Sequence, residues 1–207
     1  MGSGMGRGDA KLRRIEATLW VQGYTHVCGI DEVGMGCLAG PVVAAAVILN
    51  PQSIPKGIRD SKVLTAKRRE ALDVEIRSTA LAFAIAHATV KEIDTINILK
   101  AARLAMKRAL GQLVAPAQYL LIDGRFPLDY DLPQQAIIKG DGLSVSIGAA
   151  SIIAKVFRDK WMASLDLEFP GYGFASHKGY GSVEHRKALG EKGTTPWHRK
   201  SFSWTPV

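Results

Sequence analysis

The sequence predicts an α/β fold in which a mixed sheet is covered by helices. Short apolar runs typical of buried strands come first in the chain, and further such runs then alternate with segments of helical periodicity. No apolar run approaches the roughly 18 uncharged residues that a membrane span requires. We therefore expect a soluble protein that does not enter a membrane.

Five segments are expected to form the sheet. The runs 27–31 and 41–49 are apolar, and the glycine-rich turn between them permits a hairpin. The alternating pattern of 80–90 predicts a third strand. The runs 118–123 and 135–139 predict two more, and acidic residues end or follow three of the five.

Three segments have the periodicity of helices. The first covers 65–78, the second runs from a cap at Asp94 or Thr95 to about residue 113, and the third runs from 144 to about 165. The small residues that open the third helix would let it lie close to the sheet. On the first helix the side chains expected to point outward are Lys67, Arg68 and Arg69.

The chain is expected to form one domain over 14–207, preceded by a disordered N-terminal segment at 1–13. From about residue 161 to the end it is rich in aromatic and basic residues. That composition is typical of a groove that binds nucleic acid, so we expect 161–207 to be a C-terminal helical part that binds substrate. A small helical subdomain that packs its aromatic rings inward would have the same composition.

The charge indicates what kind of partner the protein has, and the cysteine content indicates its cellular compartment. Lys and Arg number 27 against 19 Asp and Glu, which gives a net charge of +8. Such an excess favours a polyanionic partner, although a solubilising surface charge explains it equally well. Cys28 and Cys37 form no CxxC pair. They predict small buried side chains in a reducing cytoplasm and exclude a structural zinc site.

Four acids at strand ends are the main chemical feature. They are Asp31 and Glu32 after the first strand, Asp123 after the fourth, and Asp141 after the fifth. Carboxylates gathered beside a core repel one another unless cations bind them, and all-oxygen ligands favour two Mg²⁺ or Mn²⁺ ions. Such a pair of ions catalyses phosphodiester hydrolysis. Any one of these acids could instead be a turn residue or a helix cap.

Other short motifs could contact a phosphate or a sugar. Gly34, Met35 and Gly36 follow the first acid pair, and glycines let backbone amides approach a ligand. The tripeptide 60–62 could bind phosphate, and Tyr180 lies in a glycine-flanked loop. Each is also compatible with an ordinary turn. Asp159 is a weaker candidate for a fifth acid, because Lys155 one turn away offers it an ion pair.

These motifs together closely resemble type 2 ribonuclease H, and bacterial ribonuclease HII in particular. The resemblance extends from about residue 14 to 202 with its motifs in order. The matching segments are GIDEVGMGCLAGPVVAAAV (29–47), DSK (60–62), NILKA (97–101), IDG (122–124), KGD (139–141), AASIIAK (149–155), RD (158–159), HKGYG (177–181) and EH (184–185).

The resemblance implies a ribonuclease H-like fold with a five-stranded mixed sheet, flanking helices and a C-terminal helical region. It implies an endoribonuclease that cleaves the RNA strand of RNA–DNA hybrids and incises 5′ to single ribonucleotides in duplex DNA, leaving 3′-hydroxyl and 5′-phosphate ends. Such an enzyme would serve ribonucleotide excision repair. We expect it to be a cytoplasmic monomer.

The resemblance also assigns residue roles. The positions of Asp31, Glu32, Asp123 and Asp141 would bind the two metal ions and catalyse the reaction. The backbone of 34–36, helped by Tyr180, would read the 2′-hydroxyl, the group that separates RNA from DNA. Further substrate contacts are expected at Ser61, Lys62, Asn97, Lys178 and Arg199, and the three cationic side chains among these would contact phosphates.

Three departures from the family pattern stand out. Met35 occupies the position of an arginine, Cys37 that of a proline and Gly148 that of an alanine. The backbone amides survive the first change, but a cationic phosphate contact does not. We expect weakened substrate binding or an altered junction preference, with the metal site intact.

Two other functions are compatible with parts of this pattern. A non-catalytic nucleic-acid binder could keep the fold and lose turnover through Met35, but it would have little reason to hold four carboxylates beside a polyanion. A different two-metal nuclease, such as a resolvase or integrase, would cut DNA without a 2′-hydroxyl. The glycine loop and Tyr180 argue against that second alternative.

Overall fold

The sheet has five strands in the order β3-β2-β1-β4-β5. In this computed structural model, which describes residues 14–207, β2 pairs antiparallel with β1 and β3, whereas β4 is parallel to β1 and to β5. The mixed five-stranded sheet is therefore confirmed. The expected disordered segment 1–13 lies outside the described residues. The strands are β1 (Val27–Val33), β2 (Val42–Ile48), β3 (Ala82–Ala88), β4 (Tyr119–Asp123) and β5 (Gln134–Ile137).

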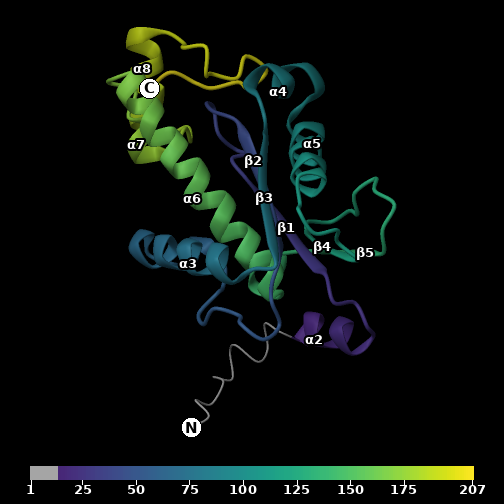
Figure 1. Ribbon diagram of the computed structural model, residues 1–207. Helices are drawn as coiled ribbons and strands as arrows, with labels where there is room; N and C mark the ends of the chain where they lie inside the picture. Colours follow the sequence, from purple (N-terminus) through teal and green to yellow (C-terminus); the bar gives the residue numbers. More distant parts are fainter. Residues whose placement is uncertain (1–13) are drawn as a thin grey trace.

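Helices cover both faces of this sheet. Figure 1 views the sheet nearly edge-on, with α5 (Ile98–Gly111) on one side and α6 (Val145–Glu168) and α3 (Ala66–Thr79) on the other. One apolar cluster joins α5 to β1, β2 and β4, and a second joins α3 and α6 to the opposite face of β2. None of the helices between residues 14 and 207 combines the length and the hydropathy that a membrane span needs.

The long helix α6 lies unusually close to the sheet because Gly29 has no side chain. A Cβ placed on Gly29 would lie 2.0 Å from the carbonyl carbon of Ser146 and 2.4 Å from the amide nitrogen of Ile147. Backbone atoms on both elements leave no room for relaxation. This contact fixes the first turn of α6 against β1, next to the strand end that carries the acids.

Two sequence expectations about helices are wrong. The helix expected from Asp94 or Thr95 is two helices, α4 (Val90–Ile96) and α5, because Asn97 adopts a positive φ of 71° and caps α5 by accepting from the Lys100 amide. Arg69, expected to point outward from α3, is half-buried. It donates to the Ser61 and Leu64 carbonyls, which turns it toward the protein.

A short helix at the start of the described chain was not predicted. In α2 (Arg14–Val21), Glu16 is completely buried and accepts hydrogen bonds from the Ser144 hydroxyl and the Ser146 amide. Burial raises the pKa of Glu16, partly offset by these donors. The contact links the N-terminal helix to the first turn of α6.

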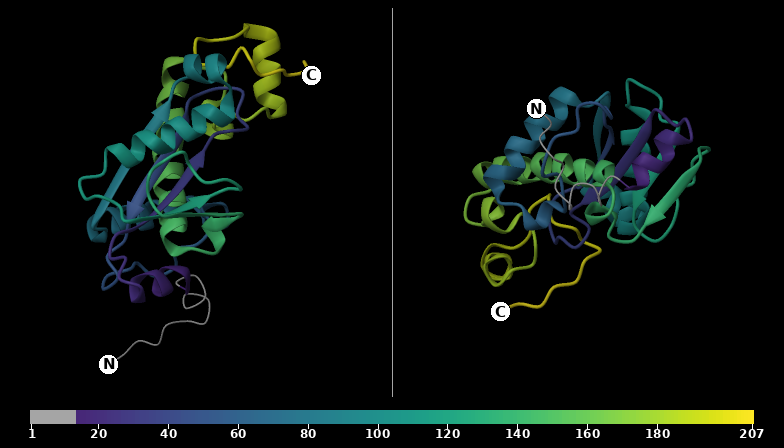
Figure 2. Two further views of the ribbon diagram at one scale, coloured as in Figure 1. Left: turned by 90° about the vertical axis from the view of Figure 1, so that its right-hand side faces the viewer. Right: turned by 90° about the horizontal axis from the view of Figure 1, so that it is seen from below.

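The C-terminal part is helical, as expected, and lies at the end of the sheet remote from α2 (Figures 1 and 2). It contains α7 (Phe174–His177) and α8 (Val183–Lys192). Several of its aromatic rings pack inward in a cluster with Ala39 and Met162. Tyr180 is an exception among these aromatic residues: it is 43% exposed, whereas Phe174 is fully buried. Cys28 and Cys37 are buried and unpaired, as the sequence predicts.

Candidate active site

Three of the four predicted acids meet at the carboxyl ends of two parallel strands. Asp31 and Glu32 lie near the end of β1, and Asp123 is the last residue of the neighbouring β4. Each of the three offers a carboxylate oxygen within 4.8 Å of the others. Successive residues of a strand point to opposite faces, so Asp31 and Glu32 leave β1 on opposite faces of the sheet, and their carboxylates still meet Asp123 where β4 ends.

Asp141 lies beside this group but is held differently. It belongs to the short 3-10 turn η2 (Gly140–Gly142), and its Oδ2 accepts from Lys62 Nζ at 3.2 Å. The amide of Gly140 donates to Asp123 Oδ1 at 2.7 Å, so the turn that carries Asp141 is tied to the third acid. Asp123, Asp141 and Lys62 line one cavity of about 630 Å³.

The electrostatics of the three acids suit a cation. Burial, followed by the charges of Glu32 and Asp123, raises the pKa of Asp31 well above its ordinary range. Burial and then the charge of Asp123 raise the pKa of Glu32 to about 7, and burial raises the pKa of Asp123. Clustered carboxylates that are costly to ionise together become stable when a divalent ion balances them.

The donor set fits a hard divalent ion. The three acids supply only carboxylate oxygens, and they lie close enough to share a cation. Asp31 also accepts from the Glu32 amide at 2.7 Å and from the Ser151 hydroxyl, which fixes its orientation. These residues could hold Mg²⁺ or Mn²⁺, with Asp141 as the adjacent fourth ligand.

The glycine loop follows the first two acids directly. Gly34 is buried with a positive φ of 97°, Met35 is half-buried and Gly36 is exposed. The amides of Met35 and Gly36 donate to no partner among the described residues. They are available to a ligand within reach of the acids.

Arg199 does not lie where the sequence predicts it. Its side chain is 3% exposed, and the guanidinium donates to the carbonyls of Gly34, Met35 and Gly40. Four of its five N–H donors thus bind backbone carbonyls inside the protein. This buried position does not favour the expected phosphate contact at Arg199, which stays a prediction, and the residue supports the glycine loop from its buried side.

Tyr180 lies next to the same loop. An isolated antiparallel bridge pairs it with Cys37, and burial raises the pKa of its phenol. A histidine relay positions its backbone: His198 Nδ1 accepts from the Thr195 amide, the Nε2 atoms of His198 and His185 lie 3.0 Å apart, and His185 Nδ1 lies 2.8 Å from the Tyr180 carbonyl. The relay requires both imidazoles to be neutral.

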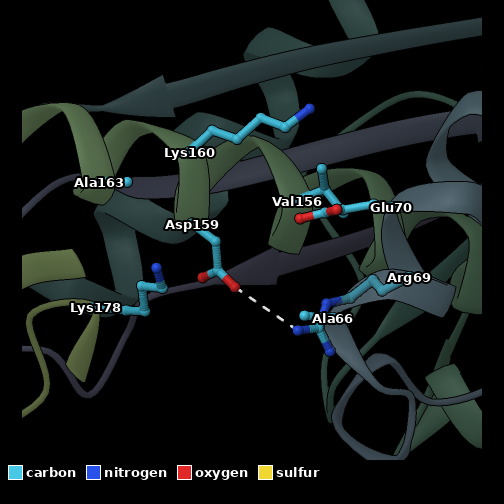
Figure 3. Close-up of a pocket in the computed structure, with 8 residues that line it drawn as sticks. All are labelled: Ala66, Arg69, Glu70, Val156, Asp159, Lys160, Ala163 and Lys178. Carbon is cyan, nitrogen blue, oxygen red and sulfur yellow. Dashed lines mark ion pairs between the residues drawn. The ribbon is translucent and has the colours of Figure 1, made fainter. Parts of the chain in front are cut away.

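Ser61 and Asp159 both contact other side chains of the protein, and Ser61 stays a predicted substrate contact. The Ser61 hydroxyl is buried 2.9 Å from that of Ser151, which in turn contacts Asp31. Asp159 pairs with Lys155 at 2.6 Å. It also pairs with Arg69 at 3.8 Å, as Figure 3 shows. These ion pairs agree with the structural interpretation of Asp159. Arg69 in turn fixes the Ser61 carbonyl, and thus the turn η1 (Ser61–Val63).

Two further predicted contacts lie apart from the acids. Asn97 caps α5, where it lines a cavity with Ser201 and Phe202. Lys178 has a positive φ of 54° and lines the cavity of about 260 Å³ that Figure 3 shows. The other charged residues there are Arg69, Lys160, Glu70 and Asp159. Asn97 and Lys178 remain predicted substrate contacts.

Met35 lines a separate, largely apolar cavity of about 310 Å³ beside the acids. Its neighbours there include Leu99, Met106 and the exposed Phe126, and Glu32 and Asp123 form part of the rim. The methionine therefore packs toward α5. Sequence reasoning did not identify this cavity, because it is formed by residues from separate elements.

The chain is similar to known ribonucleases. The family model described as ribonuclease HII matches residues 28–205. The ribonuclease HII of Syntrophotalea carbinolica is 51% identical over 194 residues, which cover 94% of this chain and 93% of that protein. The ribonuclease HII of Myxococcus xanthus is 52% identical over 93% of this chain, which spans 66% of the longer relative.

Solved structures show the same fold. The ribonuclease H2 of Pyrococcus horikoshii superposes with a TM-score of 0.71 at 28% identity, covering 85% of this chain and 93% of that one. Ribonuclease HII of Archaeoglobus fulgidus, solved in complex with PCNA, gives 0.72 at 26% identity, with 84% and 92% covered. The ribonuclease H-like fold expected from the sequence is confirmed.

Proposed function

Since the chain belongs to the ribonuclease HII family and is a nuclease of the ribonuclease H type, we propose that it cleaves the RNA strand of RNA–DNA hybrids and incises 5′ to single ribonucleotides in duplex DNA. The products would carry 3′-hydroxyl and 5′-phosphate ends. This reaction would place it in ribonucleotide excision repair.

The observation that carries the proposal is the position of the acids relative to the glycine loop. Asp31 and Glu32 belong to the cluster that can bind a cation, and Gly34 begins the loop one residue after β1 ends. A ribose whose 2′-hydroxyl meets the free loop amides would place its phosphate near the acids. Recognition and cleavage would then depend on one short segment.

The proposed cofactors are two Mg²⁺ or Mn²⁺ ions held by Asp31, Glu32, Asp123 and Asp141. Two such ions, when bound, supply an activated water and neutralise charge at the scissile phosphate. The Glu32 amide and Ser151 orient Asp31, and the Gly140 amide orients Asp123. Lys62, with a largely exposed side chain, can leave Asp141 and contact the substrate phosphate.

The basic surface supports a nucleic-acid substrate. The net charge of +8 favours binding to a polyanion, because cationic side chains release counterions from the phosphate backbone. Tyr180 is exposed beside the glycine loop, where its ring can pack against the ribose. Selectivity for RNA would come from the 2′-hydroxyl, and not from the basic surface.

The test is cleavage of an end-labelled DNA duplex that carries one ribonucleotide, in Mg²⁺ or Mn²⁺. An all-DNA duplex and a long RNA–DNA hybrid are the controls. We expect a single cut 5′ to the ribonucleotide and no cut in all-DNA. Cleavage of the all-DNA duplex would indicate a different two-metal nuclease, and tight binding without cleavage would indicate an inactive binder.

A further inference from the structure

Two buried arginines hold the glycine loop and the segment that follows it from the interior. Arg158 is completely buried and donates to the carbonyls of Ala39, Pro41 and Lys178 at 2.8–3.0 Å. Arg199 donates to the carbonyls of Gly34, Met35 and Gly40 at 2.6–3.0 Å. Arg199 thus binds two of the three carbonyls of the glycine loop, and Arg158 binds two carbonyls of the segment that leads from the loop to β2.

Neither guanidinium has a carboxylate partner within 4.0 Å in the described part of the chain. Burying a cation without a counter-charge is unfavourable, and the two cations also repel each other. A fold that needed only to fill this space could use apolar side chains. The buried guanidiniums therefore point to a requirement for many directed donors at one place.

Arg199 determines where the loop amides point. In a trans peptide the C=O and the following N–H point in opposite directions, and the described chain has no cis peptide. Arg199 draws the Gly34 and Met35 carbonyls inward, at 2.6 and 2.9 Å. The amides of Met35 and Gly36 must then face away from the interior, and neither has a partner among residues 14–207.

Packing around Arg199 keeps it in this position. Its guanidinium lies 5.0 Å from the centre of the Phe202 ring. The segment after it is fixed by Asp94 of α4, which accepts from the amides of Lys200 and Ser201 and from the Ser201 hydroxyl. Gly34 must lack a side chain, because a Cβ there would lie 2.3 Å from Arg158 Nε.

We propose that Arg199, supported by Arg158, is a positioning residue that aims the Met35 and Gly36 amides at the substrate's 2′-hydroxyl. The inference rests on the proposed function, since it concerns how that site selects RNA. Arg199 itself contacts no substrate. Removing it would free the two carbonyls, let the peptides rotate and leave phosphate binding and the metal site intact.

The experiment compares the KM for a duplex with one ribonucleotide with the Ki of an all-DNA duplex as competitor, both in Mn²⁺. For Arg199→Met we expect the KM to rise at least about ten-fold and so to approach the Ki. The Ki of the variant should stay within about two-fold of the wild-type Ki. Arg199→Lys should recover part of the loss. The control is Lys91→Met, an exposed residue of α4 that should leave both constants unchanged.

The experiment distinguishes a loss of folded protein from a loss of the orientation of the loop amides. A destabilised variant with fewer active molecules shows a lower apparent kcat at an unchanged KM, so an unchanged ratio of Ki to KM in Arg199→Met overturns the inference. If that variant does not fold, Asp94→Ala, which changes a surface carboxylate, should shift the ratio in the same direction by a smaller factor. An unchanged ratio in Asp94→Ala then overturns it.

The proposed function has a separate readout. A wild-type protein with equal KM and Ki would contradict recognition of the 2′-hydroxyl altogether. A wild-type protein that discriminates, paired with Arg199 variants that discriminate equally well, would contradict only the role of Arg199.

Discussion

Lys62 Nζ lies 3.2 Å from Asp141 Oδ2, so the fourth acid is neutralised by a lysine while the other three carboxylates face one another. The lysine side chain is 77% exposed, whereas that of Asp141 is 6% exposed. The ion pair is therefore one that a metal ion and a phosphate could replace together, the first taking Asp141 and the second taking Lys62.

Lys62→Met should separate these two roles. Without the competing ammonium, Asp141 is available to a cation, so Mn²⁺ affinity in the absence of substrate should increase about three- to ten-fold. Substrate KM should rise because a phosphate contact is lost. Titration calorimetry with Mn²⁺ and steady-state kinetics check the two effects, with the exposed Lys67→Met as control. Weaker Mn²⁺ binding in Lys62→Met would contradict this account.

Asp123→Asn should abolish cleavage and stabilise the metal-free protein. The amide keeps an oxygen for the Gly140 amide but cannot balance a cation, so activity should fall at least about a thousand-fold. Relief of repulsion with Asp31 and Glu32 should add about 1 kcal/mol, or about 2–4 °C in Tm. Calorimetry in EDTA measures the shift. Asp129→Asn, an exposed acid in the next loop, should change neither property.

The Glu32 carboxyl predicts a pH dependence of stability. Its pKa in the folded state is about 7, against an ordinary 4.5, so between these values the folded state binds more protons than the unfolded state. This contribution is fully present below pH 4.5 and is lost as the pH rises to about 7. Urea unfolding in EDTA should show wild type losing stability relative to Glu32→Gln from pH 5 to 8. A constant difference would contradict the shift.

His198 predicts the opposite trend at the other end of the molecule. Burial and then the neighbouring His185 lower its pKa to about 4 from an ordinary 6.5. Stability from the neutral imidazole is present above pH 6.5 and is lost as the pH falls toward 4. The protection of amides spanning 174–204, taken relative to their intrinsic exchange rate at each pH, should therefore decrease over this range, and His198→Gln should remove this pH dependence. Protection that decreases equally in His198→Gln would show that other groups are responsible.

Met35→Arg should raise kcat/KM by supplying the cation that the family pattern has at this position. The new side chain would have to leave the apolar cavity that Met35 shares with Leu99 and Met106. Met35→Leu, which keeps the cavity filled, is the matched control. A Met35→Arg variant no better than wild type on a single-ribonucleotide duplex would sink the idea.

Much of the fold and of the candidate site could be predicted because the relevant signals are local. The buried strands are continuous apolar runs, and the helix caps at Thr65 and Ser144 are polar residues just before periodic segments. The acids stand at strand ends in the sequence itself. Parallel pairing of β1 with β4 then brings Asp31 and Asp123 together.

What could not be predicted depends on contacts between distant segments. Arg199 resembles any basic residue of a charged tail, and only the folded chain shows that its donors reach the glycine loop, 164 and 165 positions earlier. The break at Asn97 depends on one left-handed residue within an otherwise helical pattern. In the sequence Glu16 cannot be told from a surface acid. Only the fold shows that it is buried and accepts a hydrogen bond from α6.

The contact of Gly29 with Ser146 also restricts how this sequence can vary. Every single-base change of a glycine codon that alters the amino acid introduces a Cβ, and here that atom would lie 2.0 Å from backbone. No substitution of Gly29 is therefore tolerated. Gly190 has open space around it, so a side chain is tolerated there. A complete substitution library should therefore be depleted at the first position and populated at the second, independently of any effect on chemistry.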